Sequence, residues 1–306
     1  MPAQTDILIT GANGFIGSGL IPVLLARGKR LRGLYRRSGQ AAPPGVEMVI
    51  GDLLLPESLG PAVAGIDCAY YLVHSLGAGR EHFRELDRLA AANFAEAAEQ
   101  AGVRRVIYLS GLGQRAGELS EHLASRSDVE AILAKGHFQT TILRAAIILG
   151  AGGASFELLR YLVMTQPLLL DSALLDTFCQ PIALDDVLHY LAGCGDDPST
   201  AGETFDICGP EVLSYRELLE RCAKVSGNVN LFVPVPRISP KLVGLWVGLF
   251  SRQNSAVVEA LLEGLGTPVV CQERRIQALL PHRLMPLDEA ITLALHAGRG
   301  RDHHRT

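Results

Sequence analysis

The sequence predicts an α/β fold with a doubly wound parallel sheet, and three observations support this prediction. Apolar segments of strand character alternate with helical patterns from residue 7 to about residue 149. A cluster of glycines follows the first such strand and precedes the first helix. The chain has 306 residues, 48% of them hydrophobic, which is ample for a substantial core. Strands that alternate with helices are joined by right-handed crossovers, which place helices on both faces of a parallel sheet.

Six strands and three helices are expected before residue 150. The helical patterns cover residues 14–26, 83–100 and 120–134. Ligands of such sheets bind beyond the carboxyl ends of the strands, where the strand order reverses. Functional residues are therefore expected directly after the strands, which are predicted at residues 7–10, 31–35, 47–51, 68–73, 106–110 and 141–147.

Beyond residue 150 the alternation loosens. Ser214 and Glu217 stand in the positions of a capping box, which marks the start of a helix. We expect residues 1–150 to form the sheet domain and residues 151–306 a smaller α/β lobe, some of whose segments return to the sheet. The elements expected in this lobe are helices at 155–164, 185–193 and 214–227 and strands at 179–184 and 204–208.

Composition narrows the class of protein. A net charge of −4 offers no footprint for nucleic acid. The six cysteines form no C-x-x-C pair, so free thiols in a reducing compartment and no metal site are expected.

The N-terminus shows no signal-peptide pattern, and the most apolar stretch, residues 242–250, is shorter than the roughly 20 residues that cross a bilayer. We expect a cytoplasmic protein without a transmembrane segment. Trp246 and Phe250 could dock a membrane or protein partner, with core burial as the alternative.

The glycines after the first strand have the spacing G-x-x-G-x-x-G. Glycines at such a corner let a pyrophosphate approach the peptide N–H groups, and the positive end of the following helix faces its charge. An ordinary loop is the alternative. We expect a nucleotide to bind at Thr10, Gly11, Asn13, Gly14, Phe15, Ile16 and Gly17.

The end of the second strand predicts which nucleotide binds. An acidic residue there grips the ribose hydroxyls of NAD, whereas arginine accommodates the 2′-phosphate of NADP. Here Arg36 and Arg37 follow the strand, and no Asp or Glu stands at that point. NADP(H) is therefore favoured over NAD(H); solvated surface charges are the alternative. After the fourth strand, Val73, His74 and Ser75 are expected to line the cofactor site near the nicotinamide ribose.

The glycine spacing, led by Thr10 and followed by Phe-Ile-Gly, resembles the short-chain dehydrogenase/reductase superfamily, in particular its extended and atypical members. Asp52 and Leu53 match the Asp-Leu of that superfamily, whose Asp contacts the adenine amine; a turn-forming Asp is the alternative. The superfamily's catalytic Tyr-x-x-x-Lys is absent from this chain, and Leu112 stands where its serine is expected.

His122 and Arg126 stand near the expected place of that motif, with its i, i+4 spacing, and would share one helix face. A histidine with a pKa of about 6.5 exchanges protons at neutral pH, and the arginine would hold the ribose and keep the imidazole neutral. Alternatively, both residues only anchor cofactor or structure. Ser127 and Glu130 also spell a capping box, which would leave His122 in a loop. Ser110 is the nearest hydroxyl; the alternative is that it only closes its strand.

Further segments narrow the resemblance: residues 70–77, 122–126, 143–157, 179–183 and 209–215 look like YbjT-like NAD(P)-binding proteins. That branch is akin to NmrA-like redox sensors and to the nucleotide-binding accessory subunit of respiratory complex I. It implies an NAD(P)-binding Rossmann domain followed by a substrate lobe. Arg144 and Ala145 would border the nicotinamide, and Phe156, Arg160 and Gln180 would line the opening toward a substrate, with core packing as the alternative for Phe156.

Together these patterns predict an NADP(H)-dependent oxidoreductase, whose hydride is exchanged with a small, fairly apolar carbonyl, enone or quinone-like substrate. The missing Tyr-x-x-x-Lys leaves a second hypothesis open. The protein would then sense NADP(H), or help to assemble a partner complex, without turnover.

Overall fold

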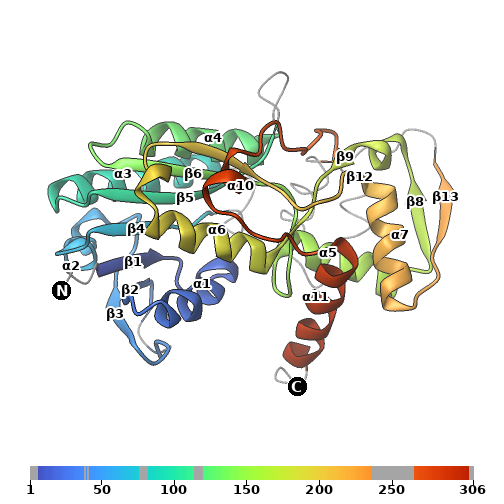
Figure 1. Ribbon diagram of the computed structural model, residues 1–306, viewed down its shortest axis with the longest axis horizontal. Coiled ribbons are helices and arrows are strands. Elements are labelled where there is room, and N and C mark those ends of the chain that lie inside the picture. The colour runs from blue at the N-terminus through green and yellow to red at the C-terminus, as the bar shows by residue number, and fades with distance from the viewer. Residues whose placement is uncertain are drawn as a thin grey trace.

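Seven parallel strands form the central sheet of the computed structural model (Figure 1). The structure describes residues 6–37, 39, 41–75, 82–113, 120–235 and 265–302, with side chains up to residue 298. The order β11-β6-β5-β4-β1-β2-β3 reverses direction between β1 and β4, as the doubly wound fold predicts. The strands are β1 (Asp6–Thr10), β2 (Arg30–Tyr35), β3 (Val46–Ile50), β4 (Cys68–Tyr71), β5 (Arg105–Gly111), β6 (Gln139–Ala145) and β11 (Thr204–Ile207).

Helices cover both faces of this sheet because its strands are apolar on both sides. In β1, Ile7 and Ile9 belong to one core cluster and Leu8 to the other. The first cluster includes apolar residues of α1 (Phe15–Ala26) and α6 (Leu184–Asp196). The second is covered by α2 (Gly60–Val63), α3 (Phe83–Gln100) and α4 (Glu121–Leu133). The predicted doubly wound α/β fold is confirmed.

A second group of elements packs beside the sheet around its own apolar cluster (Figure 1). The predicted capping box is present, since the Glu217 N–H donates to the Ser214 hydroxyl and the Ser214 N–H donates back to the Glu217 carboxylate. Two elements of this later part return to the sheet: β11 pairs with β6, and α6 packs on one face. The boundary at residue 150 stays a prediction. Its other elements are β7 (Ile148–Leu149), α5 (Ala154–Thr165), β8 (Leu168–Asp171), β9 (Phe178–Cys179), β10 (Ile182–Ala183), β12 (Leu213–Ser214), α7 (Tyr215–Ser226), β13 (Leu231–Pro234), α10 (Arg275–Leu279) and α11 (Leu287–Asp302), with single 3-10 turns at Pro56–Ser58, Ala173–Asp176 and Pro198–Thr200.

The strand predicted at residues 179–184 is wrong. The chain forms two short strands there, since β9 pairs antiparallel with β12 whereas β10 pairs parallel with β7. Pro181 stands between them, and helix α6 begins at Leu184. A proline has no N–H to donate to a sheet, so the apolar run cannot continue as one strand.

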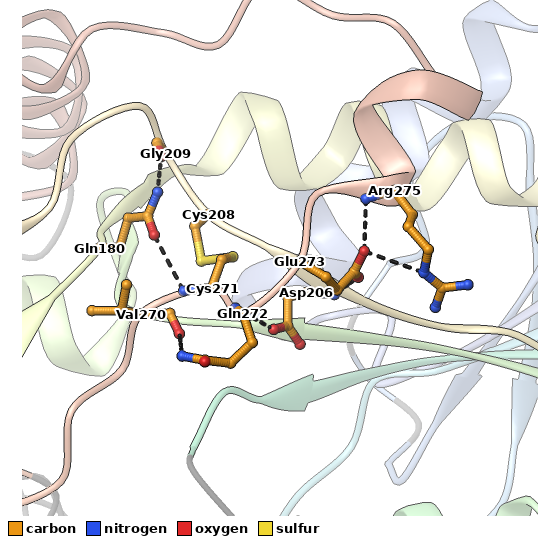
Figure 2. Close-up of a disulfide and its surroundings, with 9 residues drawn as sticks. All are labelled: Gln180, Asp206, Cys208, Gly209, Val270, Cys271, Gln272, Glu273 and Arg275. Carbon is orange, nitrogen blue, oxygen red and sulfur yellow. Dashed lines mark hydrogen bonds and ion pairs between the residues drawn. A yellow bond between two sulfur atoms is a disulfide. The ribbon is translucent and has the colours of Figure 1, made fainter.

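The expectation of six free thiols is also wrong. Cys208, directly after β11, forms a disulfide with Cys271, 63 residues later in the chain (Figure 2). The other four cysteines, Cys68, Cys179, Cys194 and Cys222, are buried and free. Sequence spacing carried no sign of this pairing because it arises only when the later segment folds back against β11.

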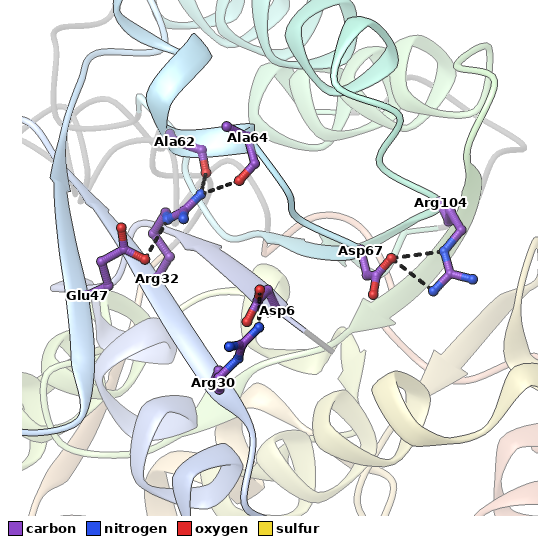
Figure 3. A network of polar contacts seen from close by, with 8 residues as sticks. All are labelled: Asp6, Arg30, Arg32, Glu47, Ala62, Ala64, Asp67 and Arg104. Atoms are coloured by element: carbon purple, nitrogen blue, oxygen red, sulfur yellow. Dashed lines mark hydrogen bonds and ion pairs between the residues drawn. The ribbon is translucent and has the colours of Figure 1, made fainter. Parts of the chain in front are cut away.

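Charged contacts hold the amino edge of the sheet, opposite the edge formed by the carboxyl ends of its strands (Figure 3). Arg30 at the start of β2 pairs with Asp6 of β1, and Arg104 before β5 pairs with Asp67 before β4. The Arg32 guanidinium donates to the Glu47 carboxylate of β3 at 2.9 Å and also to the Ala62 carbonyl of α2. Exposed pairs of this kind contribute about 0–1 kcal/mol each. These charged residues therefore serve the fold by linking neighbouring elements.

Among the described residues, every helix is too short or too polar to cross a bilayer. The stretch 242–250, with Trp246 and Phe250, lies outside the described residues.

Candidate functional site

The turn between β1 and α1 requires glycine at its three predicted positions. Gly11 has a φ of +68°, in the left-handed region that side chains disfavour, and a Cβ there would lie 2.9 Å from the Leu72 carbonyl oxygen. A Cβ on Gly14 would lie 3.0 Å, and one on Gly17 only 2.3 Å, from the Gly11 carbonyl oxygen. The turn is closed by a hydrogen bond from the Gly14 N–H to that same oxygen, at 2.8 Å. The backbone is packed too closely here for any side chain.

This turn leaves the first N–H groups of α1 open for an anion. Gly14 is the N-cap residue, no side chain caps the helix, and its first turn holds no acidic residue. The N–H groups at a helix start have no partner within the helix, and their positive end attracts phosphate. A Cβ-free cradle before an uncapped helix is the arrangement that fits a dinucleotide pyrophosphate. Asn13 is exposed beside it.

Other predicted residues of this turn serve the fold with their side chains. The Thr10 hydroxyl donates to the Tyr70 carbonyl and accepts from the Leu72 N–H, each at 3.1 Å, and thereby ties β1 to β4. Phe15 packs so tightly against the loop before α5 that a Cβ on Gly153 would lie 2.7 Å from its ring. Ile16 packs against the core. The Thr10 side chain is fully buried, whereas those of Phe15 and Ile16 remain partly exposed.

Arg36 and Arg37 follow β2 and are both exposed. Within the described residues, neither guanidinium has a hydrogen bond or an ion pair. At the end of β3, the Asp52 carboxylate accepts the Leu54 N–H at 3.0 Å, which is the turn role left open above. Leu53 is buried in the core with 5% exposure. The two arginines are therefore the free charges at this edge, whereas Asp52 is partly used by its own turn.

Helix α4 starts early enough to bring His122 and Arg126 onto one face. Its N-cap is Ser120, whose hydroxyl accepts the Leu123 N–H, so the later start at Ser127 is wrong. Arg126 reaches back to the end of β5, where it donates to the Leu109 carbonyl at 3.3 Å. The His122 ring lies edge-on to the ring of His74, with centroids 6.4 Å apart. His74 follows β4, so three elements meet at this point.

The expectation of a histidine pKa near 6.5 at this place is wrong. Burial, together with the smaller effect of the nearby Arg126 cation, lowers the pKa of His122 to about 3. Desolvation, Arg126 and His122 lower the pKa of His74 well below its usual value, although its side chain remains exposed by area. Both imidazoles are therefore neutral at pH 7, and neither carries the second ring proton with which an imidazolium acts as a general acid.

Ser110 lies at the end of β5 with 4% exposure, so its hydroxyl faces the protein interior. Tyr108, two residues earlier on the same face, is fully buried. Burial raises the pKa of Tyr108, and Arg126 and Ser110 oppose that rise. A catalytic role for Ser110 stays a prediction, and its burial does not favour it.

Asp87 is a residue that sequence reasoning missed. It lies on the buried face of α3 with 5% exposure. One carboxylate oxygen accepts the Ser75 N–H at 2.6 Å and the other accepts the Ser125 hydroxyl at 2.8 Å. The signal was available, because Asp87 interrupts an apolar stripe formed by Phe83, Ala91 and Phe94. An acidic residue on such a stripe needs buried partners.

Arg144 at the end of β6 is held by Glu130 of α4, whose side chain is 8% exposed. Two guanidinium nitrogens lie 2.5–3.2 Å from the carboxylate oxygens. These hydrogen bonds raise the pKa of Arg144. Ala145 is buried, and its carbonyl accepts the Leu112 N–H. The Arg144 charge is thus neutralised inside the protein, which argues against a direct role at the nicotinamide.

The residues expected at the substrate opening are mostly occupied elsewhere. Phe156 is 1% exposed and belongs to the core of the later elements, as its alternative predicted. Arg160 is half-buried and pairs with Glu157 at 2.9 Å. Gln180 is 1% exposed; its amide donates to the Gly209 carbonyl and its oxygen accepts the Cys271 N–H (Figure 2). Phe156 and Gln180 are therefore unavailable to a substrate in this structure.

Residues 11–155 match the family model described as NAD(P)H-binding. The comparison therefore supports an NAD(P)-binding domain over these residues, which make up slightly less than half of the chain. The matched residues include the glycine turn after β1, His122 and Arg126 of α4, and Asp87 of α3.

Curated relatives include both enzymes and an assembly factor. The chain is 25% identical over 260 residues to the chloroplastic divinyl chlorophyllide a 8-vinyl-reductase of Zea mays, across 77% of this chain and 63% of that protein. It is 25% identical over 240 residues to photosystem II assembly factor Ycf39 of Synechocystis, across 75% and 70%. A 3-beta-hydroxysteroid dehydrogenase of Mycolicibacterium neoaurum is 33% identical, but over 33% of this chain and 31% of that enzyme. The chain therefore spans less than a third of that enzyme's length.

Solved structures share the fold. A nucleoside-diphosphate-sugar epimerase of Staphylococcus aureus superposes with a TM-score of 0.78 at 18% identity, over 94% of this chain and 100% of that one. A short-chain dehydrogenase/reductase superfamily protein of Agrobacterium tumefaciens with bound NAD has a TM-score of 0.70 at 18% identity, over 98% and 100%. At this identity the likeness shows the fold alone.

Proposed function

We propose that the protein is an NADP(H)-dependent oxidoreductase that acts on a fairly apolar carbonyl, enone or quinone-like substrate. The observation that carries the choice of cofactor is the pair Arg36 and Arg37, exposed at the end of β2 where no acidic residue stands. Arginine donates paired, charge-assisted hydrogen bonds to a phosphate, and its charge is not neutralised here by a described neighbour. A ribose 2′-phosphate is the group that distinguishes NADPH from NADH.

The cradle around Gly11, Gly14 and Gly17 would hold the pyrophosphate through backbone N–H groups. Asp52, through its remaining oxygen, would contact the adenine. Val73, His74 and Ser75 would border the nicotinamide side, since they follow β4, next to the glycine turn. When bound, the cofactor supplies or accepts a hydride.

The chain's own contribution to chemistry would come from His122 and Arg126. A neutral imidazole retains one ring N–H, which can donate a hydrogen bond to a substrate oxygen. The Arg126 cation would stabilise negative charge that develops on that oxygen. Because His122 has a pKa of about 3, the proton that completes a reduction would come from water. His122 then acts as a hydrogen-bond donor and not as the general acid expected from the sequence.

Titration of the purified protein with NADPH and NADH, followed by nicotinamide fluorescence, tests the cofactor. We expect tighter binding of NADPH, and a loss of the preference when Arg36→Ala and Arg37→Ala are combined. A preference that survives both substitutions would overturn the assignment. NADPH consumption is then measured against quinones, enones and aldehydes. We expect turnover with at least one class, and slower turnover in His122→Ala.

A second candidate, an NADP(H) sensor or assembly factor without turnover, is favoured by two observations. The Tyr-x-x-x-Lys pair is absent, and His122, which stands near its place, is neutral, as is the neighbouring His74. Tight NADPH binding without consumption of any substrate, unchanged in His122→Ala, would select it. A cytoplasmic location stays a prediction, and the Cys208–Cys271 disulfide is uncommon in that compartment.

A further inference from the structure

We propose that Asp87 is the positioning residue of the nicotinamide side of the site. The inference rests on the proposed function, because it assumes that a nicotinamide dinucleotide binds along the carboxyl edge of the sheet. Asp87 itself belongs to α3 and is 5% exposed, so it does not reach a ligand directly. It acts through two hydrogen bonds to neighbouring elements.

The first hydrogen bond fixes the segment after β4. The Ser75 N–H donates to one Asp87 oxygen at 2.6 Å. Ser75 is bonded directly to His74, and Val73 lies so near the glycine turn that its Cγ2 would be 3.1 Å from a Cβ on Gly11. A loop N–H held by a buried carboxylate is a strong, charge-assisted contact. Asp87 therefore sets the position of the loop that carries His74.

The second hydrogen bond fixes helix α4. The Ser125 hydroxyl, 1% exposed, donates to the other Asp87 oxygen at 2.8 Å. Ser125 is bonded directly to Arg126 and stands three residues after His122, which is nearly one turn of helix. One carboxylate thus sets the distance between His74 on its loop and His122 on α4, whose rings lie 6.4 Å apart.

Helix α3 is itself well anchored, so it can serve as the reference for both neighbours. Phe94 is buried against Tyr71 of β4, with ring centroids 5.1 Å apart. Asn93 donates to the Leu53 carbonyl at 2.8 Å, on the adenine side of the sheet. A displaced loop or helix costs binding only where the ligand contacts it. Loss of Asp87 should therefore affect the nicotinamide end of the cofactor and leave the phosphate and adenine end unchanged.

Asparagine and alanine at this position separate geometry from charge. In Asp87→Asn, the side-chain oxygen can still accept the Ser75 N–H, and the amide can donate to the Ser125 oxygen. In Asp87→Ala, both partners lose their acceptor. Asp128→Asn is the matched control, because Asp128 also links α4 to α3, through Arg84 at 2.7 Å, but has no hydrogen bond to residues 72–75, the described part of the loop after β4.

The experiment compares two ligands in the full-length chain: NADPH, and 2′,5′-ADP, which lacks the nicotinamide half. We expect Asp87→Ala to weaken NADPH binding about tenfold and to abolish the fluorescence change of the reduced nicotinamide. Binding of 2′,5′-ADP should stay within about twofold of the wild type, which also shows that the variant is folded. Asp87→Asn should restore NADPH binding, and Asp128→Asn should not change it.

Three results would overturn the inference. Asp87→Ala could bind NADPH like the wild type, or it could lose both ligands equally, which is the signature of a general structural role. Asp87→Asn could also fail as badly as Asp87→Ala, in which case charge and not position matters. If the wild type binds neither ligand, the proposed function fails and the inference fails with it.

Discussion

The glycine turn after β1 and the contact around Gly209 are two regions in which backbone segments approach too closely for a side chain. At Gly17, a Cβ would lie 2.3 Å from the Gly11 carbonyl oxygen; at Gly209, it would lie 2.1 Å from the Pro181 carbonyl oxygen. The physical demand is the same in both. The partner differs, since it is six residues away in the turn and 28 residues away at Gly209.

This difference separates a local motif from an assembled one. In the turn, Gly14 and Gly17 are constrained by Gly11 within seven consecutive residues, and the turn leaves N–H groups open to an anion. Around Gly209, Gln180 bridges two backbone segments and the disulfide fastens Cys271 to the end of β11. The first region is built for a ligand and the second for holding the later part of the chain on the sheet. Separate damage to each should therefore have separate consequences.

Removal of the disulfide should give the largest effect, on stability. Cys208→Ala combined with Cys271→Ala should lower the free energy of unfolding by about 2–5 kcal/mol, because the bond closes a long loop of the unfolded chain. Urea unfolding followed by circular dichroism measures the loss. NADPH binding by the folded fraction should change less than about twofold.

Treatment with a dithiol is the matched control for this prediction. It should destabilise the wild type by a similar amount and leave the double variant unchanged. A double variant that unfolds at the same urea concentration as the wild type, or one that stays fully folded yet binds no NADPH, would contradict the separation of the two regions.

A substitution in the glycine turn should instead weaken NADPH binding more than it lowers stability. Gly17→Ala places a methyl group against the Gly11 carbonyl, so the turn must shift at a cost of about 1–3 kcal/mol. If that cost falls on the bound geometry, NADPH binding weakens between about 5-fold and 150-fold. Isothermal titration calorimetry measures it. Gly60→Ala is the control, since a Cβ there meets no atom within 4 Å.

The outcome that counts against this prediction is retained affinity in Gly17→Ala. A second is a loss of stability as large as that of the disulfide variant, because the turn would then be a structural element of the same kind as the Gly209 contact.

The same distinction explains how much was predictable. The glycine turn, the parallel sheet and the capping box of α7 each depend on residues within one or two elements, and all three were predicted from the sequence. The split strand at residues 179–184 was readable from Pro181 and was missed, whereas the Cys208–Cys271 pair and the two roles of Asp87 depend on partners 12 to 63 residues away. Arg144 shows the limit most clearly, since the resemblance that placed it at the nicotinamide gave no sign of Glu130 beside it.

The environment of His122 also depends on residues from several elements. Its lowered pKa gives the smallest effect that we expect, a dependence of stability on pH. In the unfolded chain a histidine titrates near pH 6.5, whereas the folded protein holds the pKa of His122 at about 3. The unfolded state therefore binds a proton that the folded state refuses. This contribution to stability is fully present above pH 6.5 and is lost as the pH falls toward 3.

The slope is at most about 1.4 kcal/mol per pH unit for one such group, and solvent around the half-buried ring reduces it. We expect the wild type to lose about 1 kcal/mol between pH 7 and pH 5 through His122, measured as a shift of the urea midpoint. His122→Gln removes the titrating group, so its midpoint should fall less over this interval. Because the pKa of His74 is also lowered, His74 too should reduce stability as the pH falls. It accounts for the loss that remains in His122→Gln. His137→Gln, a change at an exposed histidine, is the control. If His122→Gln and the wild type lose stability in parallel, His122 is not held neutral by its surroundings, and it could serve as the general acid after all.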